Sequence, residues 1–74
     1  MAYAAVRVEP PKDQSLLGVR ILGRGSRKEC RQAILDLFDE DFLENPGDAF
    51  VADTGLTILI RMDGVTWGVV EEGA

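Results

Sequence analysis

A chain of 74 residues with one cysteine and no histidine must be held together by side-chain packing or by association with another chain. Domains of this size have a small core and a net stability of about 3–5 kcal/mol, so many add a disulfide or a metal. Cys30 has no disulfide partner within the chain, and the sequence lacks the thiols and imidazoles of a structural zinc site. We therefore expect one domain at residues 1–74, without metal or cofactor, and consider a homodimer.

The charge and the hydropathy pattern indicate which partners and which cellular compartment to expect. The formal net charge is −5, which argues against nucleic-acid binding by the whole surface. No window approaches the ~18 apolar residues of a membrane span, and the first residues lack the basic and apolar regions of a signal peptide. With a single cysteine, these features predict an intracellular (cytoplasmic) protein that does not bind membranes.

The first third of the chain predicts two strands. Residues 3–8 form an apolar segment that ends at Pro10 and Pro11, because proline cannot donate a ladder hydrogen bond. A polar loop then leads to a second apolar segment at residues 16–22. We expect the glycines at 23 and 25 to end this second strand.

One amphipathic helix is predicted after the second strand. Ser26 and Glu29 have the spacing of a capping box, in which each side chain accepts from the backbone amide of the other residue. Apolar residues then recur at helical spacing and predict one buried stripe: Cys30, Ala33, Ile34, Leu37 and Phe38. We expect the helix to run from residue 27 to about residue 41.

The last third predicts two or three strands, at residues 49–52, 56–62 and from 65 onward. Asp63-Gly64 is a strong signal for a two-residue hairpin. Such a turn places Met62 opposite Val65, Ile60 opposite Trp67 and Ile58 opposite Val69, all on the face under the helix. The other face would carry an apolar strip of Leu59, Gly68 and Val70.

Together these elements predict an α+β fold. We expect one amphipathic helix packed on a mostly antiparallel sheet of four to five strands, in the order strand, strand, helix, then two or three strands.

Charged residues are segregated along the chain. Five of the eight basic residues precede or begin the predicted helix: Arg20, Arg24, Arg27, Lys28 and Arg31. Seven of the thirteen acidic residues lie at its end and beyond: Asp36, Asp39, Glu40, Asp41, Glu44, Asp48 and Asp53. A helix that starts basic and ends acidic opposes its own macrodipole. The layout indicates either contact surfaces of opposite sign or a solvated helix with incidental charges.

The acidic segment is our first candidate site. Carboxylates provide steering and an aromatic ring provides affinity, so we hypothesise that a protein or macromolecular complex binds Asp39, Glu40, Asp41, Phe42, Glu44 and Asp48. In the alternative interpretation, Phe42 and Leu43 close the core where the chain leaves the helix.

The corresponding function is that of a small acidic, non-catalytic interaction protein that modulates or inhibits its partner. Its size and charge are those of some phage or mobile-element counter-defence proteins, including nucleic-acid mimics of the anti-CRISPR type, which present carboxylates in place of phosphates. An enzyme is not expected, since without histidine there is no Ser-His or Cys-His pair. Cys30 fits the core better than a reactive site.

Other functions depend on the basic residues or on the sheet. Arg20, Arg24, Arg27, Lys28 and Arg31 would contact phosphates in a nucleic-acid-binding module, although this partner is less expected. The loop at residues 23–26 lacks the glycine spacing of a nucleotide site, so it is a turn or an incidental anion site. The Leu59 and Val70 face would serve self-association within a larger assembly.

Residues 50–55, Phe-Val-Ala-Asp-Thr-Gly, resemble the active-site loop of aspartic proteases. In that family two such aspartates share a proton and activate water. The resemblance implies a dimeric aspartic hydrolase in which each copy supplies Asp53. The family's apolar-apolar-Gly segment follows this loop, however, whereas residues 21–23 precede it here. Asp-Thr-Gly is also a common turn sequence.

Overall fold

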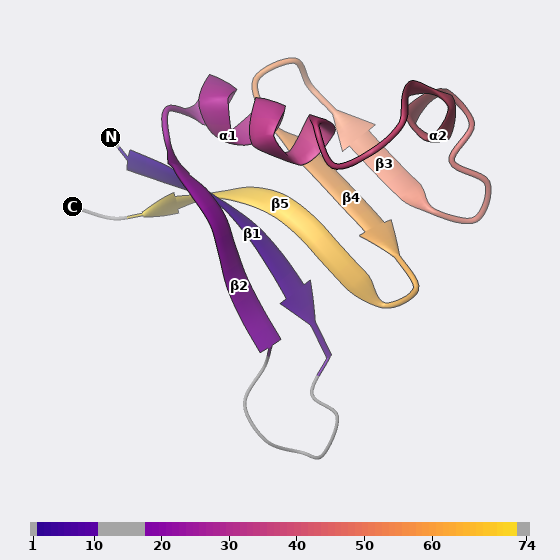
Figure 1. Cartoon of the computed structure of the whole chain (residues 1–74), viewed down its shortest axis with the longest axis horizontal. Coiled ribbons are helices and arrows are strands. Elements are labelled where there is room, and N and C mark those ends of the chain that lie inside the picture. Colours follow the sequence, from indigo (N-terminus) through magenta and orange to yellow (C-terminus); the bar gives the residue numbers. More distant parts are fainter. Residues whose placement is uncertain (1, 11–17, 73–74) are drawn as a thin grey trace.

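The computed structural model describes residues 2–10 and 18–72 of the chain. In this part, five strands form one sheet and two short helices lie on one of its faces (Figure 1). The elements follow in the order β1 (Ala2–Glu9), β2 (Gly18–Gly25), α1 (Arg27–Leu35), α2 (Glu40–Glu44), β3 (Phe50–Asp53), β4 (Ile58–Met62) and β5 (Val65–Glu72). None of the helices in the described ranges is long and apolar enough to span a membrane.

The sheet is antiparallel throughout, with the spatial order β2-β1-β5-β4-β3. The first and last strands of the chain therefore pair in its middle, and β2 and β3 are its edges. This arrangement confirms the α+β class and the antiparallel sheet. The expectation of a single helix is wrong, since residues 2–10 and 18–72 contain two.

The β4–β5 hairpin follows the register that the sequence predicts. Asp63 and Gly64 both have positive φ, 52° and 81°, as a two-residue hairpin turn of type I′ requires. Met62 pairs with Val65 and Ile60 pairs with Trp67. Ile60 lies on the sheet face that packs against α1 and is fully buried there.

The predicted helix at residues 27–41 is interrupted. α1 ends at Leu35, where the amides of Leu37 and Phe38 donate to Ile34 and Leu35 in tighter turns. α2 then begins at Glu40. The break turns the ring of Phe38 edge-on to Trp67, with the ring centroids 5.1 Å apart. Aromatic packing on the sheet therefore outweighs a helical periodicity that continues through the break.

The second strand is also longer than predicted. Its expected start at Leu16, like the polar loop before it, lies outside the described residues. Its expected end at Leu22, before the glycines at 23 and 25, is wrong, because β2 continues to Gly25. A bulge at Leu22 shifts the register, so that Ile21 pairs with Val6 while Gly23 pairs with Ala5.

The core lies between α1 and the sheet. Its fully buried members are Ala5, Cys30, Ile34, Ile58 and Ile60. The other sheet face, which we call the open face, carries no described helix. Strand pairing assigns to it Val19, Ile21 and Arg24 of β2, Ala4, Val6 and Val8 of β1, Thr66, Gly68, Val70 and Glu72 of β5, Leu59 and Arg61 of β4, and Phe50 and Ala52 of β3.

Candidate functional site

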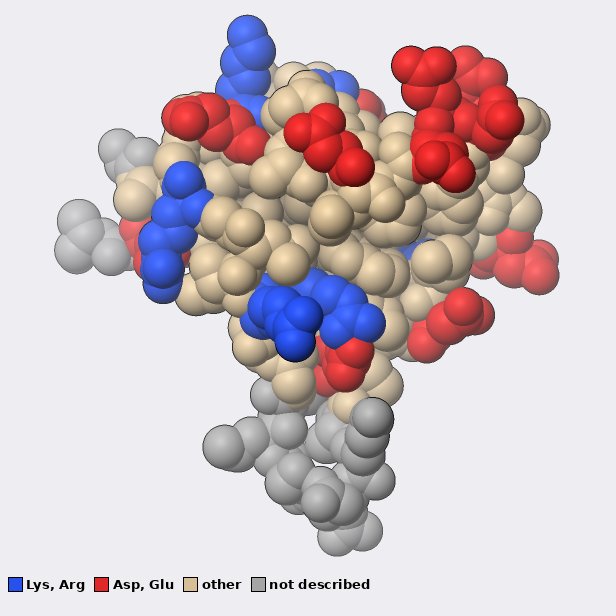
Figure 2. Space-filling model, in the orientation of Figure 1, with Lys and Arg blue, Asp and Glu red and all other residues tan. Residues whose placement is uncertain are grey.

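The break between the helices creates an acidic surface. It comprises the exposed carboxylates of Asp36, Asp39, Glu40, Asp41, Glu44 and Asp48, which we call the acidic corner. Figure 2 shows acidic side chains gathered over α2 on the face that carries the helices. The sequence has no lysine or arginine between Arg31 and Arg61, so no basic residue interrupts this segment.

The local backbone favours these charges. Asp39 is the N-cap of α2, although its side chain makes no capping hydrogen bond. Glu40 and Asp41 occupy the first turn of α2, where the helix dipole stabilises negative charge. The conflict with the macrodipole that a single long helix would produce is therefore absent at these residues. Their position results from the break, which the sequence pattern did not predict.

The exposed apolar residue of the acidic corner is Leu37, not Phe42. Phe42 is half-buried, and its ring stacks on Phe38 with the centroids 5.1 Å apart. It closes the core, as in the alternative interpretation. Leu37 is 55% exposed between Asp36 and Asp39. The helical spacing of the sequence predicts Leu37 in the buried stripe, and the end of α1 at Leu35 moves it out.

The carboxylates of the acidic corner are not neutralised by the described part of the chain. Its ion pairs are Arg7–Glu9, Arg24–Glu72 and Arg31–Asp53, and none of them involves the corner. Asp36 accepts a hydrogen bond from the side-chain amide of Gln32 at 2.8 Å, and this neutral donor brings no positive charge. Within the described ranges no three acidic, cysteine or histidine side chains converge as metal ligands. The corner is thus a surface of spread negative charge.

The five candidate phosphate-binding residues do not gather on one surface. Arg24 lies on the open face and donates to Glu72 at 2.8 Å. Arg27 stacks over the ring of Tyr3 and donates to its hydroxyl at 2.7 Å. Arg31 is paired with Asp53. Lys28 is exposed on α1, and Arg20 lies on the helix-bearing face of β2.

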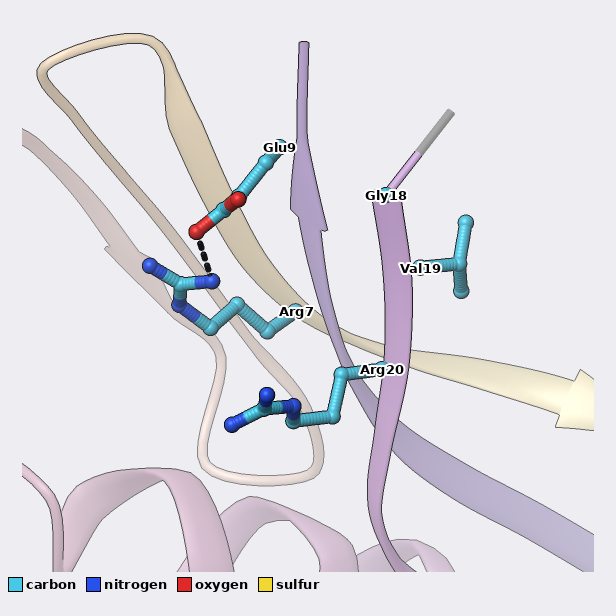
Figure 3. Close-up of a pocket in the computed structure, with 5 residues that line it drawn as sticks. All are labelled: Arg7, Glu9, Gly18, Val19 and Arg20. Carbon is cyan, nitrogen blue, oxygen red and sulfur yellow. Dashed lines mark ion pairs between the residues drawn. The ribbon is translucent and has the colours of Figure 1, made fainter. Parts of the chain in front are cut away.

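Arg20 lines a shallow hollow at the end of the sheet, with a volume of about 180 Å³ (Figure 3). Arg7 lies opposite Arg20 in the strand pairing and forms an ion pair with Glu9. The Arg7 guanidinium also lies 5.7 Å from the centroid of the Trp67 ring. The Glu9 carboxylate therefore already provides a negative charge in this hollow.

The loop before α1 is likewise occupied by the chain's own carboxylate. The Ser26 amide donates to Glu29 Oε1 at 3.1 Å, and the Glu29 amide donates to Ser26 Oγ at 3.1 Å, which confirms the predicted capping box. These bonds hold the pKa of Glu29 below its ordinary value. Gly25 has a φ of 154°, and a Cβ there would lie 3.1 Å from Glu29 Oε1. The glycine makes room for this carboxylate.

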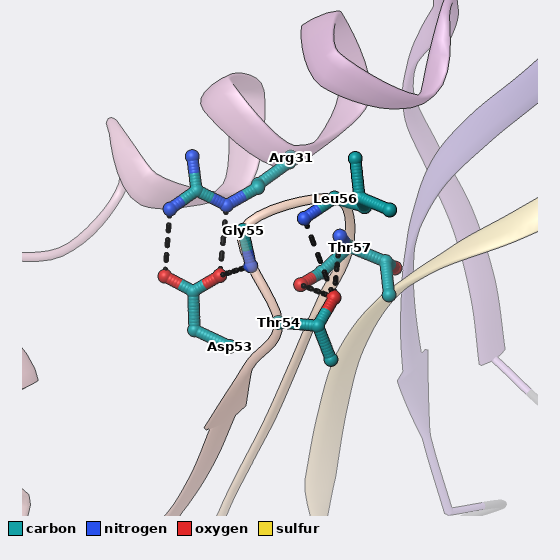
Figure 4. Close-up of polar contacts among 6 residues, drawn as sticks. All are labelled: Arg31, Asp53, Thr54, Gly55, Leu56 and Thr57. Carbon is teal, nitrogen blue, oxygen red and sulfur yellow. Dashed lines mark hydrogen bonds and ion pairs between the residues drawn. The ribbon is translucent and has the colours of Figure 1, made fainter.

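Asp53 is held in a network of structural contacts (Figure 4). Its carboxylate accepts from Arg31 Nε at 2.8 Å, from Arg31 Nη2 at 2.7 Å and from the Gly55 amide at 2.9 Å. The paired guanidinium, followed by the Gly55 amide, lowers the pKa of Asp53 to about 2. An aspartic-protease pair needs one carboxyl to hold a proton, whereas these contacts hold Asp53 ionised. They support a structural role for the turn.

Cys30 lies in the core and is 2% exposed. Burial, with a smaller contribution from the neighbouring Glu29 charge, raises the pKa of its thiol. A buried neutral thiol is a poor nucleophile, in agreement with its place in the apolar stripe.

The chain matches no protein-family model, no curated protein and no solved structure. Function is therefore inferred from the geometry of these surfaces.

Proposed function

We propose that the protein is a non-catalytic interaction domain that binds a basic macromolecular surface through the acidic corner and thereby modulates or inhibits its partner. The observation that carries this proposal is an exposed Leu37 in a segment whose six exposed carboxylates form no ion pair with the described residues. Charge accelerates encounter with a basic partner, and an apolar side chain adds affinity once water is displaced.

Local structure supports binding without large rearrangement. The backbone that presents the corner is fixed from within, because Phe38 and Phe42 stack on each other and Phe38 packs against Trp67. Asp39 through Glu44 therefore project from a packed segment. Presentation on an ordered backbone reduces the entropy cost of binding.

A partner whose basic surface otherwise holds nucleic acid would suit this arrangement. Carboxylates placed against its lysines and arginines would occupy the positions of phosphates, and inhibition would follow from competition. Counter-defence by a phage or mobile element belongs to this same proposal, which rests on size and charge.

A titration with a basic amphipathic peptide tests the acidic corner. The variant D39N/E40Q/D41N/E44Q removes four charges while keeping side-chain size and hydrogen-bonding capacity. The matched control D63N/E71Q neutralises exposed carboxylates of the β4–β5 turn and of β5, outside the corner. We expect the quadruple variant to weaken binding by at least about tenfold and the control to change it little.

Equal losses in the two variants, scaled to the charge removed, would mean that net charge attracts the peptide and that the corner is no specific surface. Far-UV circular dichroism of each variant shows whether the fold is kept. Since the corner residues are exposed, no change is expected there.

A further inference from the structure

No helix or strand of the described ranges packs on the open face, which is a second surface separate from the acidic corner. Both helices pack on the other side of the sheet, where the core cluster lies. On the open face Val19 is 58% exposed, Ile21 45%, Val70 44% and Phe50 54%. These four side chains are most of the large exposed apolar residues in the described ranges. Such concentration on one face marks an interaction surface.

The centre of the open face carries small residues. Ala4 is 1% exposed and Gly68 is buried, so the middle strands β1 and β5 present little relief. Leu59 lies over Gly68, where an added Cβ would meet its Cδ1 at 3.3 Å. An apolar sheet face can pack against another such face, and sheets packed in this way form the core of a β-sandwich.

The area is sufficient for a pair of copies. Five strands spaced about 4.8 Å apart give a width of about 24 Å, and about six residues of strand give a length of about 20 Å. Each copy then contributes roughly 500 Å², and a face-to-face pair buries roughly 1,000 Å², the lower bound of a specific interface. The molecule measures 16 Å along its shortest axis, so two copies would form a compact stack.

The charges of the open face do not oppose a second copy. Arg24 and Glu72 lie at one end of the sheet, already paired with each other. Arg61 lies at the opposite end, beside Thr66, and forms no ion pair with a described residue. A twofold axis that runs across the strands places the Glu72 end of one copy over the Arg61 end of the other. A strongly basic or acidic partner would find no complementary charge in the apolar centre.

We propose that a second copy of this chain covers the open face, in a twofold dimer that packs the two sheets against each other with the helices outside. The acidic corners then lie on the outer, helix-bearing sides, where their repulsion is small and each remains accessible to a partner. Dimerisation through the open face does not depend on what the acidic corner binds.

Sedimentation equilibrium of the full chain and of lysine variants tests the dimer. Ile21→Lys and Val70→Lys place a charge in the proposed interface, and Leu56→Lys is the matched control, at a side chain 62% exposed in the turn before β4. We expect a wild-type dimer that persists in high salt. The two interface variants should raise its dissociation constant by roughly a hundredfold, while Leu56→Lys leaves it unchanged.

Val19→Lys is the variant expected to keep the monomer fold, since Val19 is 58% exposed on an edge strand and a lysine there remains in solvent in the monomer. It should also dissociate the dimer while the circular dichroism spectrum is kept. A wild-type monomer at every concentration would overturn the proposal. It would indicate that a different protein covers the open face. A dimer unaffected by all three lysines would also overturn it, and would point to pairing through the β2 or β3 edge.

Discussion

Arg31 of α1 and Asp53 of β3 form a bidentate ion pair, with distances of 2.8 Å from Nε to Oδ1 and 2.7 Å from Nη2 to Oδ2. The pair ties the helix to an edge strand and fixes the turn that leads into β4, because the Gly55 amide donates to the same carboxylate. The residue that resembles a protease aspartate thus joins two elements of the fold.

Replacing Asp53 by Asn should lower the melting temperature at neutral pH by about 4 °C, the order expected when a surface-linked ion pair is lost from a small domain. The folded-state pKa of about 2 lies below the ordinary value of 3.8, so the ion pair stabilises the fold above about pH 4. That stability is lost as the pH falls toward 2. Melting curves across this range should show the wild type and D53N converging at low pH.

Asp63→Asn is the control for that experiment, because Asp63 lies in the hairpin turn with no ion pair to a described residue. Its melting temperature should follow the wild type at each pH. If D53N and the wild type differ as much at pH 2 as at pH 7, the ion pair is not the origin of the difference.

The helix break predicts opposite sensitivities for two leucine-sized residues of the same apolar stripe. Ile34 is fully buried, so Ile34→Ala should cost about 2–5 kcal/mol, comparable with the whole stability of a small domain, and the milder Ile34→Val about 0.5–1.5 kcal/mol. Leu37→Ala should change stability by less than about 0.5 kcal/mol, because Leu37 is 55% exposed. Urea denaturation at one fixed protein concentration measures all three variants.

A large loss of stability in Leu37→Ala would show that the helix continues past Leu35, as the sequence pattern alone suggests.

The features predicted correctly from sequence are local ones. The Asp63-Gly64 turn and the Ser26–Glu29 capping box each depend on residues at most three apart, so the chemistry of the short segment determines the structure. The pairing of Ile60 with Trp67 follows from that turn.

The features that were missed depend on distant contacts. α1 stops at Leu35 although the apolar spacing continues, because Phe38 and Phe42 pack together and Phe38 meets Trp67 from the far end of the chain. The exposure of Leu37, and hence the apolar part of the candidate site, follows from that packing. The Arg31–Asp53 pair joins residues 22 positions apart, a partnership that a charge pattern does not specify.

The glycines of β2 should differ in their tolerance of alanine. Gly25→Ala should destabilise the fold by about 1–3 kcal/mol, since φ is 154° and the new Cβ would lie 3.1 Å from the Glu29 carboxylate. Gly23 has no atom within 4 Å of a built Cβ, so Gly23→Ala should be neutral or stabilise the strand by about 0.5 kcal/mol. Urea midpoints of the two variants give the comparison, and equal losses would contradict the account of Gly25.

The contribution of Leu37 to binding can be measured separately from that of the carboxylates. Leu37→Ser should weaken binding of the basic amphipathic peptide by roughly fivefold, whereas Leu56→Ser, at an equally exposed leucine outside the corner, should have no effect. Isothermal titration calorimetry gives both affinities. If the two serine variants bind alike, Leu37 is not part of the binding surface.

The salt dependence of peptide binding shows whether the carboxylates of the acidic corner form the binding surface. The affinities of the wild type and of D39N/E40Q/D41N/E44Q are measured at low and at moderate salt. We predict a steep loss of wild-type affinity with salt, and both weak binding and a shallow salt dependence in the variant, because its steering charges are gone. Equal affinity and equal salt dependence in the two proteins would contradict the assignment of the acidic corner as the binding surface.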